Sequence, residues 1–500
     1  IHKGQLEGNM GEEGYLSFET FPHTALVKTY NVDAQTPDSA GTMTAMMSGL
    51  KTDVGVIGVD EDIERGECAT VAGNEVITAL ELAEIRGLST GIVSTARITH
   101  ATPAATYAKS ADRNWEDISD MPEDAVTEGC VDIADQLVNF ESFVEARYTG
   151  VDIDGIEVAM GGGRRHFLPN DASANSPDAS SDVEGDRSDG RNLVTEWQDT
   201  YSNGVYVYDE TGFDAIDTEN TERLFGLFNE SHMQYEADRA NDIAGEPSIA
   251  EMTETAINIL DNNEKGFFLM VESGRIDHAH HAGNAFRALS ETIALSKAVH
   301  AIQSALSEEE KEDTLILVTA DHSHTFTIAG YPTRGNPILG LVVGNDDHGN
   351  PESSPKKDAM GLPYTTLAYA NGGGYTGPMQ NKKSKEITTG GVHFHLDIGD
   401  GGGPLAAHED WKYLHTPRRP RPDLSEVDVG CEDYVQESGV ALSSETHAGE
   451  DMAVFAIGPM AHLIRGVIEQ NFLYHVMRYA SGDMEKPRGI QATTSARTRR

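Results

Sequence analysis

Short apolar runs alternate with amphipathic segments along most of this 500-residue chain. Four runs are rich in Val, Ile, Leu, Phe and Met and end in Gly, Ser, Thr or Asp, as parallel strands covered on both faces do. These predicted strands are residues 89–95, 155–163, 266–274 and 313–321. Apolar residues recur at helical spacing in residues 73–87, 249–263 and 285–306. The alternation predicts an α/β fold, with a central, largely parallel sheet flanked by helices on both faces.

Two regions interrupt this alternation. Residues 171–190 are acidic and rich in Ser, which predicts a surface loop. Residues 345–443 carry many Gly, Pro and charged residues, and the apolar run 452–459 then resumes the pattern of a core strand. We therefore predict one main α/β domain, formed by residues 1–344 and 444–500. Residues 345–443 are predicted to be an inserted subdomain of loops and short strands.

The chain is strongly acidic, with 82 Asp and Glu residues against 37 Lys and Arg residues and a net charge of −45. Nucleic acid would be repelled by this charge, so we expect no partner of that kind. Two explanations remain: a solvated surface adapted to high salt, where screening relieves self-repulsion, or a specific cationic partner. We favour the first.

Sequence signals of membrane attachment are absent. No apolar run approaches the roughly 18 residues of a membrane span, and the C-terminal "SARTRR" is basic rather than apolar. The chain begins with Ile1 and shows no signal peptide, so we expect a start that is processed or missing. Its three cysteines, Cys68, Cys130 and Cys431, permit one disulfide with one thiol left over and exclude a four-cysteine zinc cluster.

Acidic and imidazole side chains gather where predicted strands end. Asp277 and His281 follow one strand, four residues apart, which places both on one face of a helical turn. Asp321 and His322 end another strand, and His447 lies in a polar turn. Singly, such residues are more often surface or capping groups than ligands. Because the carboxyl ends of parallel strands share one edge of a sheet, together they predict a metal site with ligands that zinc accepts.

Two more oxygen donors and one arginine belong to the same edge. Glu272 ends the strand before Asp277, and Thr102 follows the strand at residues 89–95. Both offer hard oxygens that suit Mg²⁺. Arg113 offers a planar fork that matches two oxygens of a phosphate. Taken alone, Thr102 is more simply a helix cap and Arg113 a surface ion pair.

The segment "QTPDSAGTMTAMMSGL" (residues 35–50) places Ser39 at the start of a predicted helix. Ser39 could simply cap this helix. It could also be a nucleophile, with its hydroxyl held in the positive end of the helix field. The segment alone does not decide between the two.

These stretches resemble the alkaline phosphatases, and the animal-type branch more closely than the shorter enteric bacterial one. The matching stretches include "KTYNVDAQTPDSAGTMTAMMSGLKT", "THATPAATYAKSADRNW", "FFLMVESGRIDHAHH", "LVTADHSHTFTIAGYPTRGNPILGL" and "ETHAGEDMAVFAIGPMAHLIRGVIEQ". They run in the family's order from about Gly4 to about Gly482. The resemblance implies the alkaline phosphatase-like fold, with residues 345–443 as its crown-like subdomain. It also implies a homodimer and broad hydrolysis of small phosphate monoesters.

The resemblance further implies roles for individual residues. Ser39 would be the nucleophile that becomes phosphorylated, and Arg113 would bind the substrate phosphate. The metal ligands would be Asp277, His281 and His447 for one zinc ion, Asp321 and His322 for a second, and Thr102 and Glu272 for a magnesium ion. The pocket around them would be lined by Asp38, His100, His278 and His324. A calcium site beside the sheet would involve Phe228 and Glu246, although Asn229 stands where an acid is usual.

Two further implications concern the cysteines and the start of the chain. Cys68 and Cys130 match a disulfide of the animal branch, which leaves Cys431 unpaired and fits a periplasmic or secreted protein. The family opens with a strand that ends in an Asp bridging the second zinc and the magnesium. The chain printed here begins downstream of that strand, so it is either outside this sequence or lost. Without it, the sheet has one strand fewer and two metals share one ligand fewer.

Two other interpretations stay open: a different enzyme of related fold, and a protein without turnover. Sulfatases, phosphodiesterases and cofactor-independent phosphoglycerate mutases share related sheets and metal ligands. A sulfatase requires a C/S-x-P-x-R sequence, which "DSAGT" lacks, and a mutase would more often bind manganese. A protein that binds metal or phosphate without turnover is the remaining alternative, because the first Asp is missing.

Overall fold

The computed structural model describes residues 1–375 and 421–482. Its largest sheet has five strands, all parallel, in the order β4-β5-β3-β2-β6. They are β2 (Ser89–Arg97), β3 (Val158–Gly162), β4 (Val205–Val207), β5 (Leu224–Leu227) and β6 (Phe267–Glu272). The predicted strands at 89–95, 155–163 and 266–274 are confirmed, and so is the α/β class.

A second sheet has four strands in the order β14-β1-β13-β7. They are β1 (His23–Lys28), β7 (Ile316–Thr319), β13 (Met452–Ile457) and β14 (Gly466–Glu469). The strands predicted at 313–321 and 452–459 are confirmed as β7 and β13. However, β13 pairs antiparallel with both β1 and β7. The sequence could not reveal this, because an apolar run that is buried on both faces carries no information about strand direction.

Strands β6 and β7 each pair on one side only within residues 1–375 and 421–482, and they end their respective sheets. Their carboxyl ends are close, since Asp277 Oδ1 after β6 lies 4.0 Å from His322 Nε2 after β7. Most of their side chains are half-buried, whereas β2 is buried along its whole length.

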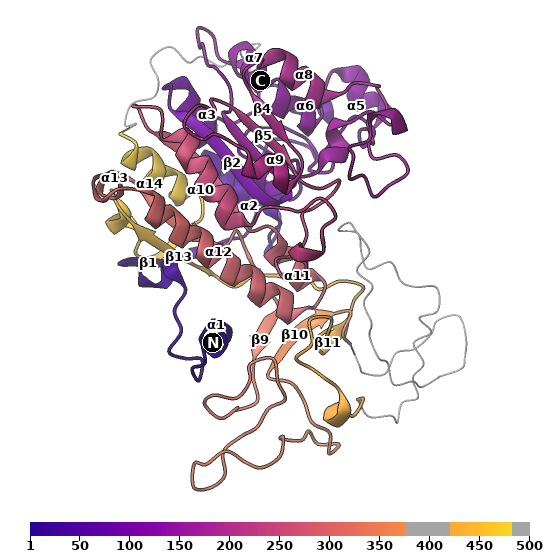
Figure 1. Ribbon diagram of the computed structural model, residues 1–500, viewed down its shortest axis with the longest axis vertical. Coiled ribbons are helices and arrows are strands. Elements are labelled where there is room, and N and C mark those ends of the chain that lie inside the picture. The colour runs from indigo at the N-terminus through magenta and orange to yellow at the C-terminus, as the bar shows by residue number, and fades with distance from the viewer. Residues whose placement is uncertain (376–420, 483–500) are drawn as a thin grey trace, which may run out of the picture.

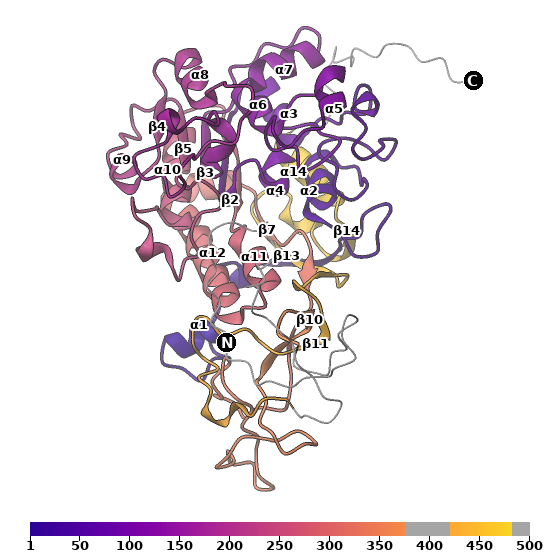
Figure 2. The same ribbon diagram turned by 90° about the vertical axis from the view of Figure 1, so that its right-hand side faces the viewer.

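Helices cover both faces of the five-stranded sheet (Figures 1 and 2). Ile92 of β2 packs in a core cluster with Leu80 of α3 (Ala79–Ile85). The next residue, Val93, packs in another cluster with Met252 of α10 (Ile249–Leu260), against which α12 (Ala285–Ala305) lies. Alternate side chains of one strand therefore enter two separate cores, as a strand covered on both faces requires.

The predicted helices are confirmed with shifted ends. The segment predicted at 73–87 becomes helical only at Ala79, because Thr78 and Glu81 form a capping box there. Helices α10 and α12 begin where predicted and end within a few residues of the predicted limit. The helices that position the site are α2 (Ser39–Ser48), α4 (Ala101–Ala104), α11 (Arg275–His281) and α14 (Phe472–Ala480).

The shorter elements complete the fold. The other helices are α1 (His2–Leu6), α5 (Glu123–Glu128), α6 (Ile133–Val138), α7 (Phe140–Arg147), α8 (Leu193–Thr200), α9 (Glu210–Asp214) and α13 (Glu308–Asp313). The short strands β8 (Ser323–His324) and β12 (His447–Ala448) pair antiparallel with each other. No helix in the described ranges is both long and apolar enough to cross a membrane.

A small three-stranded sheet lies below the main body in Figure 1. It contains β9 (Phe326–Ile328), β10 (Leu367–Gly372) and β11 (Ser438–Ala441). It joins residues on both sides of position 345, where the inserted subdomain was predicted to begin. Residues 376–420 of that insertion and the "SARTRR" end lie outside the described residues, so the boundaries of the subdomain stay a prediction.

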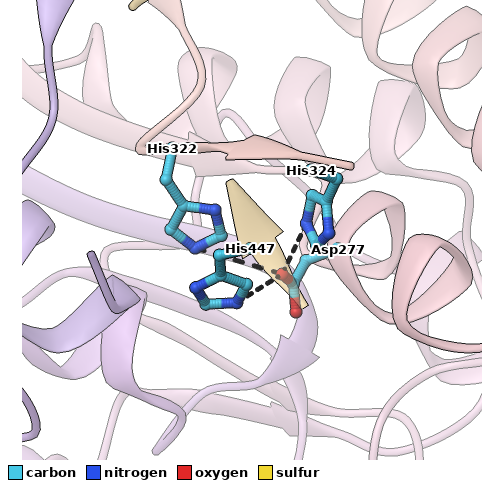
Figure 3. A group of neighbouring side chains, drawn as sticks. All are labelled: Asp277, His322, His324 and His447. Atoms are coloured by element: carbon cyan, nitrogen blue, oxygen red, sulfur yellow. Dashed lines mark ion pairs between the residues drawn. The ribbon is translucent and has the colours of Figure 1, made fainter. Parts of the chain in front are cut away.

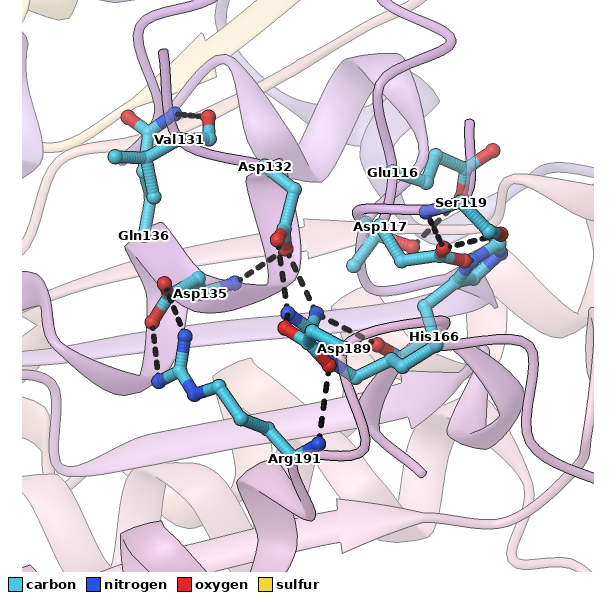
Figure 4. Close-up of polar contacts among 12 residues, drawn as sticks. Glu116, Asp117, Ser119, Val131, Asp132, Asp135, Gln136, His166, Asp189 and Arg191 are labelled. Atoms are coloured by element: carbon cyan, nitrogen blue, oxygen red, sulfur yellow. Dashed lines mark hydrogen bonds and ion pairs between the residues drawn. The ribbon is translucent and has the colours of Figure 1, made fainter. Parts of the chain in front are cut away.

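The predicted surface loop at 171–190 is only partly at the surface. Arg187 and Glu184 within it are buried. Arg187 pairs with Asp132 and Asp189, while Glu184 pairs with Arg164. Figure 4 shows Asp132 and Asp189 in this network. The prediction was wrong here because polar composition cannot show that a charged side chain has a buried partner of opposite charge.

Cys68 and Cys130 form a disulfide, as the resemblance implied, and Cys431 is free and exposed. The bridge closes a segment with a sequence separation of 62 residues that packs around Val56, Val59 and Trp115.

Replacing Cys68 by Ser should therefore lower the free energy of unfolding by about 3–4 kcal/mol, because the unfolded chain regains the entropy of an open loop. Cys431→Ser is the matched control and should leave stability unchanged. Urea unfolding followed by circular dichroism measures both. Equal midpoints for Cys68→Ser and the wild type would contradict the assignment.

Candidate active site

Helix α2 begins at Ser39, and its N-cap is the preceding Asp38, whose carboxylate accepts a hydrogen bond from Gly41 N at 3.1 Å. Ser39 is therefore not the cap, which resolves the question that its sequence raised. Its buried hydroxyl instead lies 3.0 Å from His322 Nε2. The Ser39 hydroxyl therefore lies at the positive end of this ten-residue helix without being used to cap it.

Asp277, His281 and His447 come together from α11 and β12, and we call them the first metal site. Nε2 of His281 lies 3.1 Å from Nε2 of His447. Oδ1 of Asp277 lies 3.4 Å from the former and 3.3 Å from the latter. A tetrahedral zinc with bonds of about 2.0–2.1 Å separates its ligand atoms by roughly 3.3–3.4 Å. The three atoms therefore have the spacing of one face of a zinc site. Figure 3 shows two of these residues, Asp277 and His447, beside His322 and His324.

Hydrogen bonds fix the orientation of both imidazoles in the first metal site. His281 Nδ1 donates to the backbone carbonyl of Glu445 at 2.6 Å, and His447 Nδ1 donates to that of Pro37 at 2.7 Å. Since a carbonyl can only accept, Nδ1 carries the proton in each ring. Nε2 of each ring is therefore the nitrogen that faces Asp277, as in histidines that bind metals through Nε2.

Asp321 and His322 lie beside Ser39 at the end of β7, and we call these two residues the second metal site. Asp321 Oδ2 lies 3.2 Å from His322 Nε2 and accepts a hydrogen bond from Thr42 Oγ1 at 3.1 Å. Burial lowers the pKa of His322 to about 4, so its imidazole is neutral and able to bind a metal.

Three buried atoms around the metal sites have no hydrogen-bond partner: Asp277 Oδ1, His322 Nδ1 and His324 Nε2. Asp277 Oδ1 and His324 Nε2 lie 2.9 Å apart. Burial opposes the charge of Asp277, but His281 and the other facing histidines hold the pKa of its carboxyl well below the usual value. A buried carboxylate oxygen without a donor is costly, and a bound cation would satisfy it. The residues thus fit the zinc that the resemblance implied.

Glu272 and Thr102 are also brought together, at the end of β6 and in α4. Thr102 Oγ1 and Ser94 Oγ hydrogen-bond to the carboxylate of Glu272. Burial raises the pKa of Glu272 to about 7. These oxygens suit Mg²⁺. Ser94 was missed by the sequence reasoning because it lies inside an apolar strand, with no signal of its own.

Arg113 is held over the start of α2 by Asp38. Its Nη1 donates to Asp38 Oδ2 at 3.0 Å, and Nη2 lies 3.4 Å from His100 Nε2. Burial works against the charge of Asp38, but Arg113 and backbone donors outweigh it and lower its pKa. Burial, together with Arg113 and Arg97, lowers the pKa of His100 to about 3. Arg113 is therefore a fixed positive charge beside Asp38, the residue that precedes Ser39.

The remaining pocket residues fall near the metal sites. The ring of His278 lies 5.4 Å from that of His100 and 4.0 Å from that of His232. His324 faces Asp277. Sequence reasoning missed Thr42, His232 and Glu445. The sequence could have indicated Thr42, because this residue lies one helical turn after Asp38 and on the same helix face as Ser39.

A profile of the alkaline phosphatase family matches residues 1–482. The chain belongs to this family. Its tissue-nonspecific relatives from rat and human are each 41% identical over 484 residues, which cover 96% of this chain and 80% of the relative. The alkaline phosphatase of Gadus morhua is 40% identical, with coverage of 96% of this chain and 87% of its own length.

Solved alkaline phosphatases share the fold. The enzyme from Thermus thermophilus superposes with a TM-score of 0.59 and 20% identity, covering 97% of this chain and 88% of that one. The enzyme from the Antarctic bacterium TAB5 gives 0.55 and 19%, covering 95% and 93%. At these identities the match supports the fold alone.

The predicted calcium residues do not fit that ion well. Phe228 packs in the core. One oxygen of Glu246 accepts from Asn229 Nδ2 at 2.9 Å and the other from Gln234 N at 2.8 Å. Both oxygens of Glu246 are thus already occupied by donors, and burial raises its pKa to about 8. Calcium prefers several charged or carbonyl oxygens, so we derive no role for it.

Another group of possible ligand atoms, Asp117, His166 and Asp186, is an ion-pair network. His166 Nδ1 lies 2.5 Å from Asp117, and its Nε2 lies 3.3 Å from Glu116 (Figure 4). Glu116 is further paired with Arg97. With both imidazole nitrogens already facing carboxylates, this group needs no metal.

Replacing His447 by Ala should weaken zinc binding at the first metal site by more than about 100-fold, because a ligand is lost rather than a supporting residue. His300→Ala, an exposed histidine on α12, is the control and should bind zinc like the wild type. Titration of the metal-free proteins with zinc in the presence of a chromophoric chelator measures both. Unchanged affinity in His447→Ala would refute the assigned site.

Proposed function

We propose that this protein hydrolyses phosphate monoesters through a phosphoserine formed on Ser39, with two zinc ions and one magnesium ion as cofactors. The observation that supports this proposal most directly is the position of the Ser39 hydroxyl. It is buried at the start of α2 and lies 3.0 Å from His322 Nε2. His322 in turn lies 4.0 Å from Asp277 of the first metal site, and Arg113 pairs with Asp38, the residue before Ser39.

The proposed substrate is an anion, and the overall negative charge of the protein repels anions. The net charge of −45 disfavours the approach of a phosphate dianion. The positive end of α2 and the Arg113 guanidinium oppose this locally. Arg113 is already oriented by Asp38, so its planar fork can bind two non-bridging oxygens without first losing conformational freedom.

The reaction has two displacements at phosphorus. Ser39 Oγ attacks, the bond from phosphorus to the ester oxygen breaks, and the alcohol leaves with a proton. Water then attacks the phosphoserine, the bond to Ser39 Oγ breaks, and phosphate leaves. Arg113 holds the phosphoryl oxygens in line throughout. When bound, the zinc and magnesium ions would lower the pKa of the oxygens they hold and stabilise charge on the attacking and leaving oxygens.

Contacts in this scheme are made to the phosphate and not to the alcohol. We therefore propose a broad range of monoesters as substrates. The need for deprotonated oxygens at Ser39 and at water favours an alkaline pH optimum.

Ser39→Ala should lose turnover of a phosphate monoester by at least about 1,000-fold while keeping wild-type zinc content, because the nucleophile is removed and the metal ligands remain. Ser48→Ala, a buried serine at the other end of α2, is the matched control and should stay active. Steady-state rates on a monoester, a diester and a sulfate ester test both variants. A fully active Ser39→Ala would contradict the mechanism, and a wild type that prefers the diester or sulfate would overturn the substrate class.

The oligomeric state, compartment and salt response are further parts of the proposal. We propose an exported homodimer adapted to high salt. The disulfide supports export. Exposed apolar side chains support an interface, notably Tyr331, which is 95% exposed in a left-handed backbone conformation.

Raising the KCl concentration should raise the thermal midpoint of unfolding, because salt screens the repulsion among surface carboxylates. Sedimentation at each salt concentration should give the mass of a dimer. A midpoint that falls with salt contradicts the adaptation, and a monomer mass at every concentration contradicts the homodimer.

A further inference from the structure

Glu445 is a buried carboxylate directly behind the first metal site. Only 1% of the residue is exposed. Its Oε1 accepts hydrogen bonds from Thr325 N at 2.6 Å and Thr325 Oγ1 at 2.7 Å. Its Oε2 accepts from His324 Nδ1 at 2.8 Å. A carboxylate this deeply buried is costly unless its oxygens are satisfied, and here both are.

The contact with His324 fixes that ring. Because a carboxylate accepts, the proton of the imidazole lies on Nδ1, which turns Nε2 toward Asp277 Oδ1 at 2.9 Å. Asp277 Oδ1 and His324 Nε2 are both among the buried atoms without a hydrogen-bond partner. Glu445 thus fixes which nitrogen of His324 faces the carboxylate that belongs to the first metal site.

The backbone of Glu445 likewise fixes the orientation of the His281 ring. Its carbonyl accepts from His281 Nδ1 at 2.6 Å, and its N–H donates to the carbonyl of His281 at 3.0 Å. Glu445 also lies two residues before His447 on the same segment. One residue therefore ties together the end of α11, strand β8 and the segment that carries His447.

We propose that Glu445 is a positioning residue for the first metal site. Its carboxylate anchors the segment carrying His447 to Thr325 and His324, so that Nε2 of His281 and of His447 converge on Asp277. Partners of metal-bound histidines have this effect generally, since they set the tautomer and orientation of the ring. This inference depends on the proposed function in one respect, namely that the first metal site binds zinc.

Glu445→Gln tests the charge without changing the shape. The amide keeps one acceptor oxygen for Thr325 but presents an N–H to His324 Nδ1, where an acceptor is required. The variant should bind zinc about 10–100-fold more weakly. Excess zinc should restore its activity, which loss of folding would not allow. Metal-free protein titrated with zinc against a chromophoric chelator gives the affinity independently of turnover.

Glu450→Gln is the matched control. Glu450 lies on the same segment, on the other side of His447, and accepts a hydrogen bond from Ser323 Oγ at 3.0 Å, but it is exposed. Its affinity for zinc should equal that of the wild type. Wild-type affinity in Glu445→Gln, or equal losses in both variants, would overturn the proposal.

Thr325→Val keeps the test decisive if Glu445→Gln does not fold. It removes one donor to the carboxylate and leaves the backbone donor, so a smaller loss of zinc affinity, of about 3–10-fold, is expected. Cobalt in place of zinc should give a visible spectrum that differs from the wild type in either variant. Unchanged affinity and spectrum in Thr325→Val would then overturn the proposal. A wild type that binds zinc normally but hydrolyses no monoester would instead refute the proposed function and leave this one standing.

Discussion

The site depends on the electrostatic balance around Asp277. Its carboxylate is surrounded by His281, His324 and His447, and its Oδ1 has no hydrogen-bond donor. Nε2 of each histidine lies 2.9–3.4 Å from this oxygen. Although burial opposes the charge, the facing histidines, His281 above all, hold the pKa of the Asp277 carboxyl well below its usual value. A cation bound among these atoms would compensate the buried negative charge. A metal ion can therefore hold these segments together more effectively than direct contacts between their side chains. The segments are as many as 170 positions apart in the chain, from residue 277 to residue 447.

A second carboxylate organises the reacting side of the pocket. Asp38 caps α2, pairs with Arg113 and accepts from Gly55 N at 2.9 Å. The same residue thus sets the start of the helix that carries Ser39 and the position of the guanidinium over it. With a net charge of −45 acting against any phosphate, this local positive potential decides whether substrate binds.

Much of this site could be predicted because its ligands follow predicted strands. Asp277 and Asp321 follow apolar runs, and the carboxyl ends of these two strands do lie close together. They belong to two different sheets, however, rather than to one edge of a single parallel sheet as expected. Ser94 and Glu445 could not be found this way. Ser94 lies inside a strand, and the role of Glu445 depends on contacts with Thr325, 120 positions away. The antiparallel direction of β13 and the buried charges in residues 171–190 were likewise set by tertiary partners rather than by local pattern.

Anomalous X-ray scattering at the zinc absorption edge, from crystals of the zinc-loaded protein, tests the central claim most directly. Our account predicts one peak among Asp277, His281 and His447, and a second between Asp321 and His322 beside Ser39, with the two about 4 Å apart. Zinc found only elsewhere on the chain, or no peak within bonding distance of these side chains, would contradict it.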